Sequence, residues 1–275
     1  MCVEAAWDRA GIRGAPRITL PLPGCQLLSP APCFFRSRGS CVTYGREGSA
    51  NQRKEEEKRR RFWEEAWQKG NIGFHKEEVH RYLRRHYIRL AVATGETVFV
   101  PLCGKSRDLL WLAEEEAAVC GVELSTLAVD AFFAENALEA ARQSYGPFES
   151  WRSGTLQILL GDLFALVPAD LAEVRAVYDR ASLVAFPPDM RRRYADHLAV
   201  LLPSGCRILL VSYTYEQSEL AGPPFSVPPA EVEELFGDAF TIELLEEEDA
   251  LSDHPTLRAR GLTALTESAR LLVRR

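Results

Sequence analysis

The hydrophobic positions of this chain first follow a helical period and then break into short, separate runs. A mixed-charge segment at 54–61 leads into apolar residues at helical spacing, namely Phe62, Trp63, Ala66 and Trp67. A second helical repeat runs from 76 to 90 through Val79, Leu83, Tyr87 and Leu90. Both patterns predict amphipathic helices, and we expect the folded part to begin near residue 53.

From residue 97 onward, short apolar runs alternate with longer amphipathic segments. We predict helices at 106–116, 126–144, 188–202 and 229–236, and strands at 97–101, 118–122, 156–160, 176–178, 207–213, 240–246 and 269–274. This alternation is typical of a parallel sheet with helices on both faces, and the late adjacent strands indicate an antiparallel edge. The expected fold is α/β: a doubly wound, mostly parallel, seven-stranded, Rossmann-like sheet.

Residues 1–52 are rich in Pro, Gly, Arg, Ser and Cys and lack either period, which predicts a disordered extension before a single domain at 53–275. A transit-like extension and translated upstream sequence both stay open as explanations. Glu4 and Asp8 stand where a secretory signal needs basic residues, and early prolines interrupt any apolar segment. We therefore expect a cytoplasmic protein.

The charge balance favours a small-molecule ligand. The chain has 33 Lys and Arg against 39 Asp and Glu, a net charge of -6, which gives no general attraction to nucleic acid or anionic lipid. No apolar run approaches the roughly 20 residues that a membrane helix needs. We expect no nucleic-acid or membrane partner, and a monomer.

The seven cysteines include no CxxC pair. Cys103, Cys120 and Cys206 lie in apolar or Gly-flanked segments and are predicted to be reduced core residues. The even spacing of 25, 33 and 41 admits a zinc interpretation, but no fourth ligand stands at a suitable distance in the sequence. No metal site is predicted.

The loop after the first strand of the sheet is where an open α/β fold places its ligand. It contains one glycine, Gly104, and neither the GxGxxG pattern of dinucleotide enzymes nor the complete spacing of a phosphate-binding P-loop. The second strand ends in Glu123, at the position of a ribose acceptor. A solvated acid at a strand end is the alternative for Glu123.

Six segments in order resemble the thiopurine S-methyltransferase family. They are 62–67 (FWEEAW), 73–75 (GFH), 101–105 (PLCGK), 121–123 (GVE), 178–180 (YDR) and 222–225 (GPPF), and the resemblance covers about residue 62 to the end of the chain. It implies a class I methyltransferase core with an N-terminal helical lid at about 60–90. It also implies S-adenosyl-L-methionine as the methyl donor.

The resemblance assigns roles to individual residues. Those implied to bind the cofactor are Trp63, Trp67, Leu102, Gly104, Glu123, Asp162 and Leu163. For the two tryptophans, simple core packing is the alternative, and for Asp162 it is an exposed acid. Those implied to bind the substrate are Phe74, Arg180, Pro224, Phe225 and Arg258, with Arg260 as an alternative to Arg258.

Arg180 is the expected catalytic residue, since it follows the fourth strand where donor and acceptor are implied to meet. It would stabilise an anionic sulfur. The implied reaction is methyl transfer to the sulfur of thiopurine-like or aromatic thiols. Two alternatives stay open: methylation of selenium, tellurium or sulfide species for detoxification, and a non-catalytic scaffold that binds S-adenosylmethionine.

Overall fold

The computed structural model describes residues 50–70 and 75–275, and their centre is a nine-stranded sheet in the order β3-β4-β5-β2-β1-β6-β7-β9-β8. The predicted extension lies outside the described residues, except for 50–52. The strands are β1 (Thr97–Val100), β2 (Ala118–Glu123), β3 (Ala141–Tyr145), β4 (Phe148–Ser153), β5 (Leu156–Leu160), β6 (Val174–Asp179), β7 (Arg207–Thr214), β8 (Phe240–Asp249) and β9 (Thr266–Arg274).

The five central strands run parallel and both edges of the sheet are antiparallel. Strands β5, β2, β1, β6 and β7 pair in parallel, while β3 and β4 extend one edge and β9 and β8 the other. The doubly wound α/β fold is thus confirmed. The expected count of seven strands is wrong by two, because β3 and β4 were not predicted.

Helices cover both faces of the sheet, as strand β1 illustrates. Val98 and Val100 belong to a buried cluster with helices α2, α3 and α4, whereas Phe99 belongs to a cluster with α5 and α6. The α-helices are α1 (Ala50–Gln68), α2 (Arg81–His86), α3 (Asp108–Glu114), α4 (Thr126–Glu135), α5 (Pro188–Leu201), α6 (Pro229–Phe236) and α7 (Pro255–Ala259). The 3-10 helices are η1 (Tyr87–Leu90), η2 (Leu163–Ala165), η3 (Pro168–Leu171), η4 (Leu183–Ala185), η5 (Gln217–Glu219) and η6 (Leu251–Asp253).

Two predicted helices are shorter than the sequence pattern indicates. The helix expected over 126–144 ends at Glu135, and Ala137 takes a left-handed φ of 52° before β3 begins. The helix expected over 76–90 starts only after His80, whose side chain accepts a hydrogen bond from the backbone N–H of Tyr82, and it continues as η1. Tyr82 is completely buried, so α2 belongs to the core, not to a lid.

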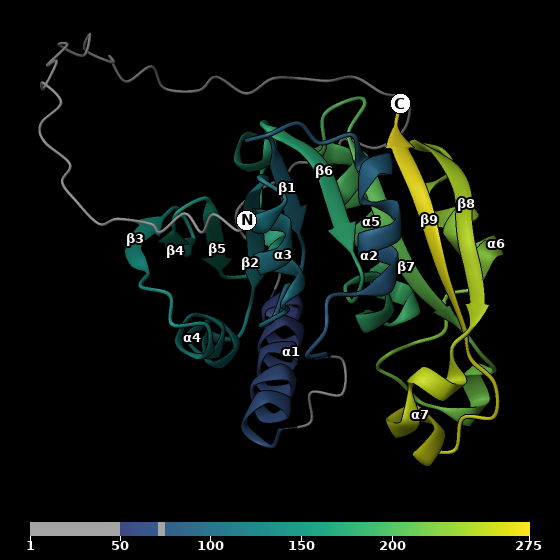
Figure 1. The fold of residues 1–275 in the computed structure, drawn as a ribbon. Helices are drawn as coiled ribbons and strands as arrows, with labels where there is room; N and C mark the ends of the chain where they lie inside the picture. The colour runs from purple at the N-terminus through teal and green to yellow at the C-terminus, as the bar shows by residue number, and fades with distance from the viewer. Residues whose placement is uncertain (1–49, 71–74) are drawn as a thin grey trace, which may run out of the picture. The chain divides into compact units, whose positions relative to one another are not determined.

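Helices α1 and α7 lie at one end of the sheet, the end to which the arrow of β6 points (Figure 1). This is the carboxyl end of the parallel strands, where open α/β sheets bind their ligands. No helix within 50–70 or 75–275 is long and apolar enough to cross a lipid bilayer. Cys103, Cys120 and Cys206 are buried and free, as predicted.

Candidate active site

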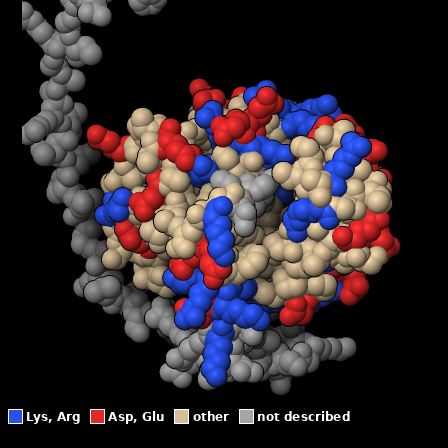
Figure 2. Space-filling view, turned by 90° about the horizontal axis from the view of Figure 1, so that it is seen from below, with Lys and Arg blue, Asp and Glu red and all other residues tan. Residues whose placement is uncertain are grey.

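A cavity of about 740 Å³ opens at the carboxyl end of the parallel strands. Its walls come from α1, from the loops that follow β1, β2, β5 and β6, from residues 222–224 and from the region of α7. Figure 2 views this end of the sheet and shows a hollow with Lys and Arg atoms beside it. The volume falls within the usual range of about 300 to 1,000 Å³ for small-molecule sites.

The loop after β1 has an unusual backbone. Leu102 and Gly104 both adopt left-handed conformations, with φ of 44° and 54°. A Cβ atom at position 104 would lie 3.2 Å from the indole of Trp67, so the contact with α1 also favours glycine here. The chain therefore turns sharply and keeps its backbone open to the cavity.

Glu123 holds this loop in place from the end of β2. Its Oε2 accepts a hydrogen bond from the backbone N–H of Gly104 at 2.9 Å, and its Oε1 accepts from Leu124 and Ser125, each at 2.8 Å. Burial raises the pKa of Glu123, and the three backbone donors offset part of that rise. The carboxylate thus shapes the cavity floor as well as lining it, a role that the sequence pattern did not reveal.

Asp162 also lines the cavity, two residues after the end of β5. Its Oδ1 accepts a hydrogen bond from the backbone N–H of Phe164 at 3.0 Å and so caps η2. Its Oδ2 lies 3.6 Å from the guanidinium of Arg59 on α1. This ion pair connects α1 to the loop after β5.

The structure brings together all seven residues expected to bind a cofactor. Each lines the same cavity: Trp63, Trp67, Leu102, Gly104, Glu123, Asp162 and Leu163. Their contacts with a cofactor remain a prediction. Because they face one cavity from α1, from the end of β2 and from the segments that follow β1 and β5, they could enclose an adenosyl group between aromatic and carboxylate side chains.

Arg180 enters the cavity from the end of β6, and its neighbour Asp179 forms the turn that directs it there. Asp179 is buried and accepts hydrogen bonds from the backbone N–H groups of Ser182 and Leu183 at 3.1 and 3.3 Å and from the hydroxyl of Tyr194 at 2.7 Å. No described carboxylate forms an ion pair with Arg180. The guanidinium is therefore available to a ligand.

Arg180 stays protonated and positively charged. Burial acts to lower the pKa of Arg180, but Tyr178 and Asp108 more than compensate, and the pKa is raised above its ordinary value. A permanently charged, half-buried guanidinium at a cavity wall suits an anionic ligand.

The other residues expected to bind substrate divide into three groups. Pro224 lines the cavity, but Phe225 does not: its ring packs on Gly222, where a Cβ atom would lie only 2.4 Å from it. Of the two arginine alternatives, Arg260 lines the cavity and Arg258 does not. Residues two apart near the end of a short helix point in nearly opposite directions, which separates these two side chains. Phe74 lies outside the described residues.

Among the cavity residues that the sequence analysis missed, three lie together: Lys76, Tyr213 and His254. The Nζ of Lys76 donates a hydrogen bond to the backbone carbonyl of Asp253 at 3.3 Å. The rings of Tyr213 and His254 meet edge to face at 5.2 Å. Burial, then the charge of Lys76, lowers the pKa of His254 to about 4, so its imidazole is neutral near pH 7. The Tyr-His-Lys group forms one wall.

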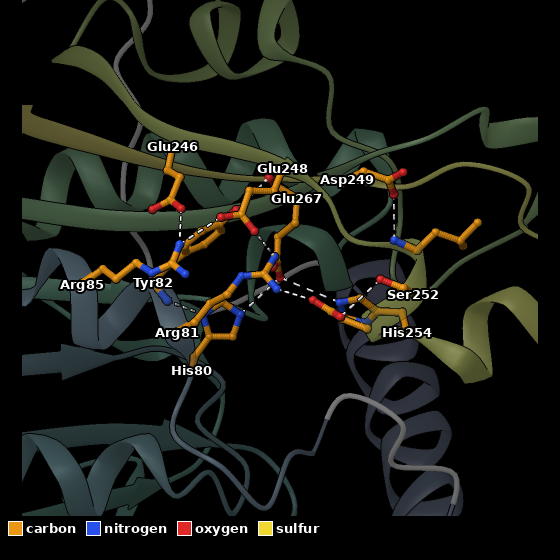
Figure 3. Close-up of polar contacts among 12 residues, drawn as sticks. His80, Arg81, Tyr82, Arg85, Glu246, Glu248, Asp249, Ser252, His254 and Glu267 are labelled. Atoms are coloured by element: carbon orange, nitrogen blue, oxygen red, sulfur yellow. Dashed lines mark hydrogen bonds and ion pairs between the residues drawn. The ribbon is translucent and has the colours of Figure 1, made fainter.

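A network of ion pairs fixes this wall to α2 (Figure 3). The guanidinium of Arg81 contacts Asp253, lies 3.4 Å from Glu248 and donates to the buried Glu267 at 2.8 Å. His80 Nε2 lies 3.2 Å from the same Glu267. Since His254 follows Asp253 directly, Arg81 positions the segment that carries it.

We expect Arg81→Met to lower the free energy of unfolding by about 2 to 4 kcal/mol, because it leaves the buried Glu267 without its principal cation. Arg85→Met is the matched control. Arg85 lies one turn later on α2, is half exposed and contacts Glu246 and Glu248, away from the cavity, so its loss should lower the free energy of unfolding far less than the loss of Arg81. Urea unfolding of both variants measures the difference in the free energy of unfolding. If both variants lost the same amount, Arg81 would not be the residue that stabilises the buried charge of Glu267.

Comparisons with known proteins agree with this arrangement. The family model described as Thiopurine S-methyltransferase matches residues 58–275. Proteins named thiopurine S-methyltransferase from Nitrosospira multiformis and Azotobacter vinelandii are each 48% identical over 217 and 214 residues. The first alignment covers 79% of this chain and 99% of the relative, and the second covers 78% and 98%.

Solved structures show the same fold at low sequence identity. A 1,6-didemethyltoxoflavin-N1-methyltransferase from Burkholderia thailandensis, solved with S-adenosylhomocysteine, aligns with a TM-score of 0.52 at 14% identity, over 82% of this chain and 92% of its own. A SAM-dependent methyltransferase from Methanosarcina mazei aligns with a TM-score of 0.50 at 13% identity, over 71% and 98%. These likenesses concern the fold alone.

Proposed function

Because the chain belongs to the thiopurine S-methyltransferase family, we propose that it transfers the methyl group of S-adenosyl-L-methionine to the sulfur of thiopurine-like or aromatic thiols. That it is a methyltransferase dependent on S-adenosyl-L-methionine follows from the family. The non-catalytic scaffold considered above gains no support from relatives that are named as methyltransferases.

The donor half of the cavity fits S-adenosyl-L-methionine. Glu123 uses three of about four acceptor positions on backbone donors, which leaves Oε2 able to accept from a ribose hydroxyl. The faces of Trp63 and Trp67 suit an adenosyl ring and a sulfonium cation. When bound, the cofactor supplies an electrophilic methyl group. The chain's task is then to orient the acceptor in line with it and to exclude water.

The charged side chains that line the cavity favour an anionic acceptor. Its acids are all engaged: Glu65 pairs with Lys69 at 2.9 Å, Asp162 with Arg59 at 3.6 Å, and Glu123 with three backbone donors. The remaining charged side chains in the described lining are cationic and form no ion pair: Lys76, Arg180 and Arg260. A surplus of positive charge favours an anionic acceptor, as a thiolate is.

Arg180 is the residue that we assign to the reacting sulfur. Its charged guanidinium stabilises the thiolate over the neutral thiol and holds it at the carboxyl end of β6, so no strong base is required. The alternative of selenium, tellurium or sulfide species uses the same charges. However, Val184, Phe186 and Leu257 also line the cavity. An aromatic ring is stabilised by burial against these apolar side chains, whereas a small inorganic selenium, tellurium or sulfide species has no apolar surface to bury.

A transfer assay with a methyl-labelled donor tests this function. The acceptors are a thiopurine, an aromatic thiol, selenite, tellurite and the oxygen analogue of the aromatic thiol. We expect label on the thiopurine and the aromatic thiol, and none on the oxygen analogue. Label on selenite or tellurite alone would replace the proposed acceptor, and cofactor binding without transfer to any of them would support a scaffold.

A further inference from the structure

Two cationic side chains line the cavity, and no described acid forms an ion pair with either of them. Lys76 and Arg180 are both half-buried and both line the cavity. Lys76 makes one hydrogen bond, to a backbone carbonyl, and no described acid forms an ion pair with either side chain. The neighbouring stretch 71–74 contains no acidic residue in its sequence. Two positive charges thus face the ligand space.

The nearby acids are committed elsewhere. Asp253 and Glu267 are the two carboxylates that act on Lys76, but both are contacted by the guanidinium of Arg81, and Glu267 also by His80. Burial would raise the pKa of Glu267, yet His80 and Arg81 hold it below its ordinary value, so its charge is already used. In the ion-pair network of Figure 3 both acids are thus already paired with other cations, and neither forms an ion pair with Lys76.

The positive charges of Lys76 and Arg180 disfavour each other. Burial lowers the pKa of Lys76, and the charge of Arg180 lowers it further. His254, on the same wall, is neutral near pH 7 and supplies no negative charge. A ligand with two negative charges would relieve this repulsion, whereas a simple thiolate would neutralise only one of the pair.

The geometry assigns different partners to the two cations. Arg180 also borders a small recess with Trp67, Leu102 and Gly104, residues of the donor half, so it stands nearer to the reacting sulfur. Lys76 does not border that recess and belongs to the wall of Tyr213 and His254.

We propose that the chain prefers aromatic or heteroaromatic thiols that carry a carboxylate, and that Lys76 is the residue that selects them by binding this carboxylate while Arg180 faces the sulfur. This inference rests on the proposed function. In the transfer, a sulfur lone pair of the thiolate forms the new bond to the methyl carbon. The bond from that carbon to the donor sulfonium breaks, and its electron pair stays on the donor sulfur. The carboxylate does not react, so the thioether product keeps the negative charge of the carboxylate and loses that of the thiolate.

The test compares kcat/KM for 3-carboxybenzenethiol and its uncharged carboxamide, which matches it in size. We expect the protein to prefer the carboxylate, and Lys76→Gln to lower that preference about 10-fold, the scale of one charge-assisted hydrogen bond in a half-exposed site. Lys76→Arg should keep most of the preference. Lys69→Gln is the matched control, because Lys69 also lines the cavity but is paired with Glu65; it should change the preference less than about 2-fold.

The results distinguish a failure of the carboxylate preference from a failure of the proposed function. No preference in the unaltered protein, or an equal loss for both acceptors in Lys76→Gln, would overturn the inference while leaving thiol methylation intact. Methylation of neither thiol would overturn the proposed function itself. A preference that weakens as salt concentration rises would support the charge-based selection.

Discussion

Arg180→Ala is expected to lower kcat/KM for thiol acceptors about 10- to 100-fold and to leave the dissociation constant of S-adenosyl-L-methionine within about 2-fold. The guanidinium lines the cavity, keeps its charge and forms no ion pair with a described carboxylate. Its removal therefore takes away the cation that stabilises the thiolate. Steady-state kinetics and calorimetric titration of the cofactor measure the two effects separately.

Two further variants make this test specific. Arg180→Lys should restore only part of the activity, because an ammonium keeps the charge but loses the planar fork. Arg175→Ala is the matched control: Arg175 lies on the same strand, is exposed and contacts only Glu96 at 3.4 Å among the ion pairs of the described chain. If Arg180→Ala abolished cofactor binding or unfolded the protein without changing acceptor preference, its role would be structural.

Glu123→Ala is expected to weaken cofactor binding by about 1 to 3 kcal/mol and to lower the free energy of unfolding by about 2 to 4 kcal/mol. The variant loses the candidate ribose acceptor. It also leaves the backbone N–H groups of Gly104, Leu124 and Ser125 without the carboxylate that accepts from them. Calorimetric titration and urea unfolding measure the two losses.

Glu123→Gln should fall between the two, because its carbonyl oxygen can still accept from Leu124 and Ser125 while its amide nitrogen cannot accept from Gly104. Glu96→Ala is a suitable control. Glu96 accepts a backbone hydrogen bond from Ala93 at 2.9 Å, but on an exposed loop before β1. It should cost less than about 1 kcal/mol and leave cofactor affinity unchanged. A folded Glu123→Ala variant with full affinity would remove Glu123 from the site.

The central part of the fold was predictable because buried parallel strands form continuous apolar runs. Strands β1, β2, β5, β6 and β7 are buried on both faces, and each gave such a run. Strand β3 gave none, since all five of its residues are exposed and it is held by pairing with β4 alone. Its polar sequence was therefore read as the end of a helix.

The residues proposed to bind the donor carry a similar signal in the sequence. Glu123 is the last residue of β2, and Gly104 and Asp162 lie in the short segments that follow β1 and β5, so linear motifs mark them. The wall of Lys76 and His254 is different, because it joins segments that are far apart in sequence and have no regular pattern. What brings them together is the contact of Arg81 with Asp253 and Glu267, which only the folded chain reveals.

The two halves of the cavity also have separate origins along the chain. Apart from α1, the proposed donor residues come from 102–104, from the end of β2 and from 162–164, whereas the proposed acceptor residues come from Lys76, from 180–186 and from 213–260. Apart from Lys76, the two sets follow different strands of the sheet. Evolution can thus diversify the range of acceptors by drift in one set of surface segments while inheriting the donor machinery intact. The same boundary marks where segments could be exchanged between relatives to retarget the enzyme.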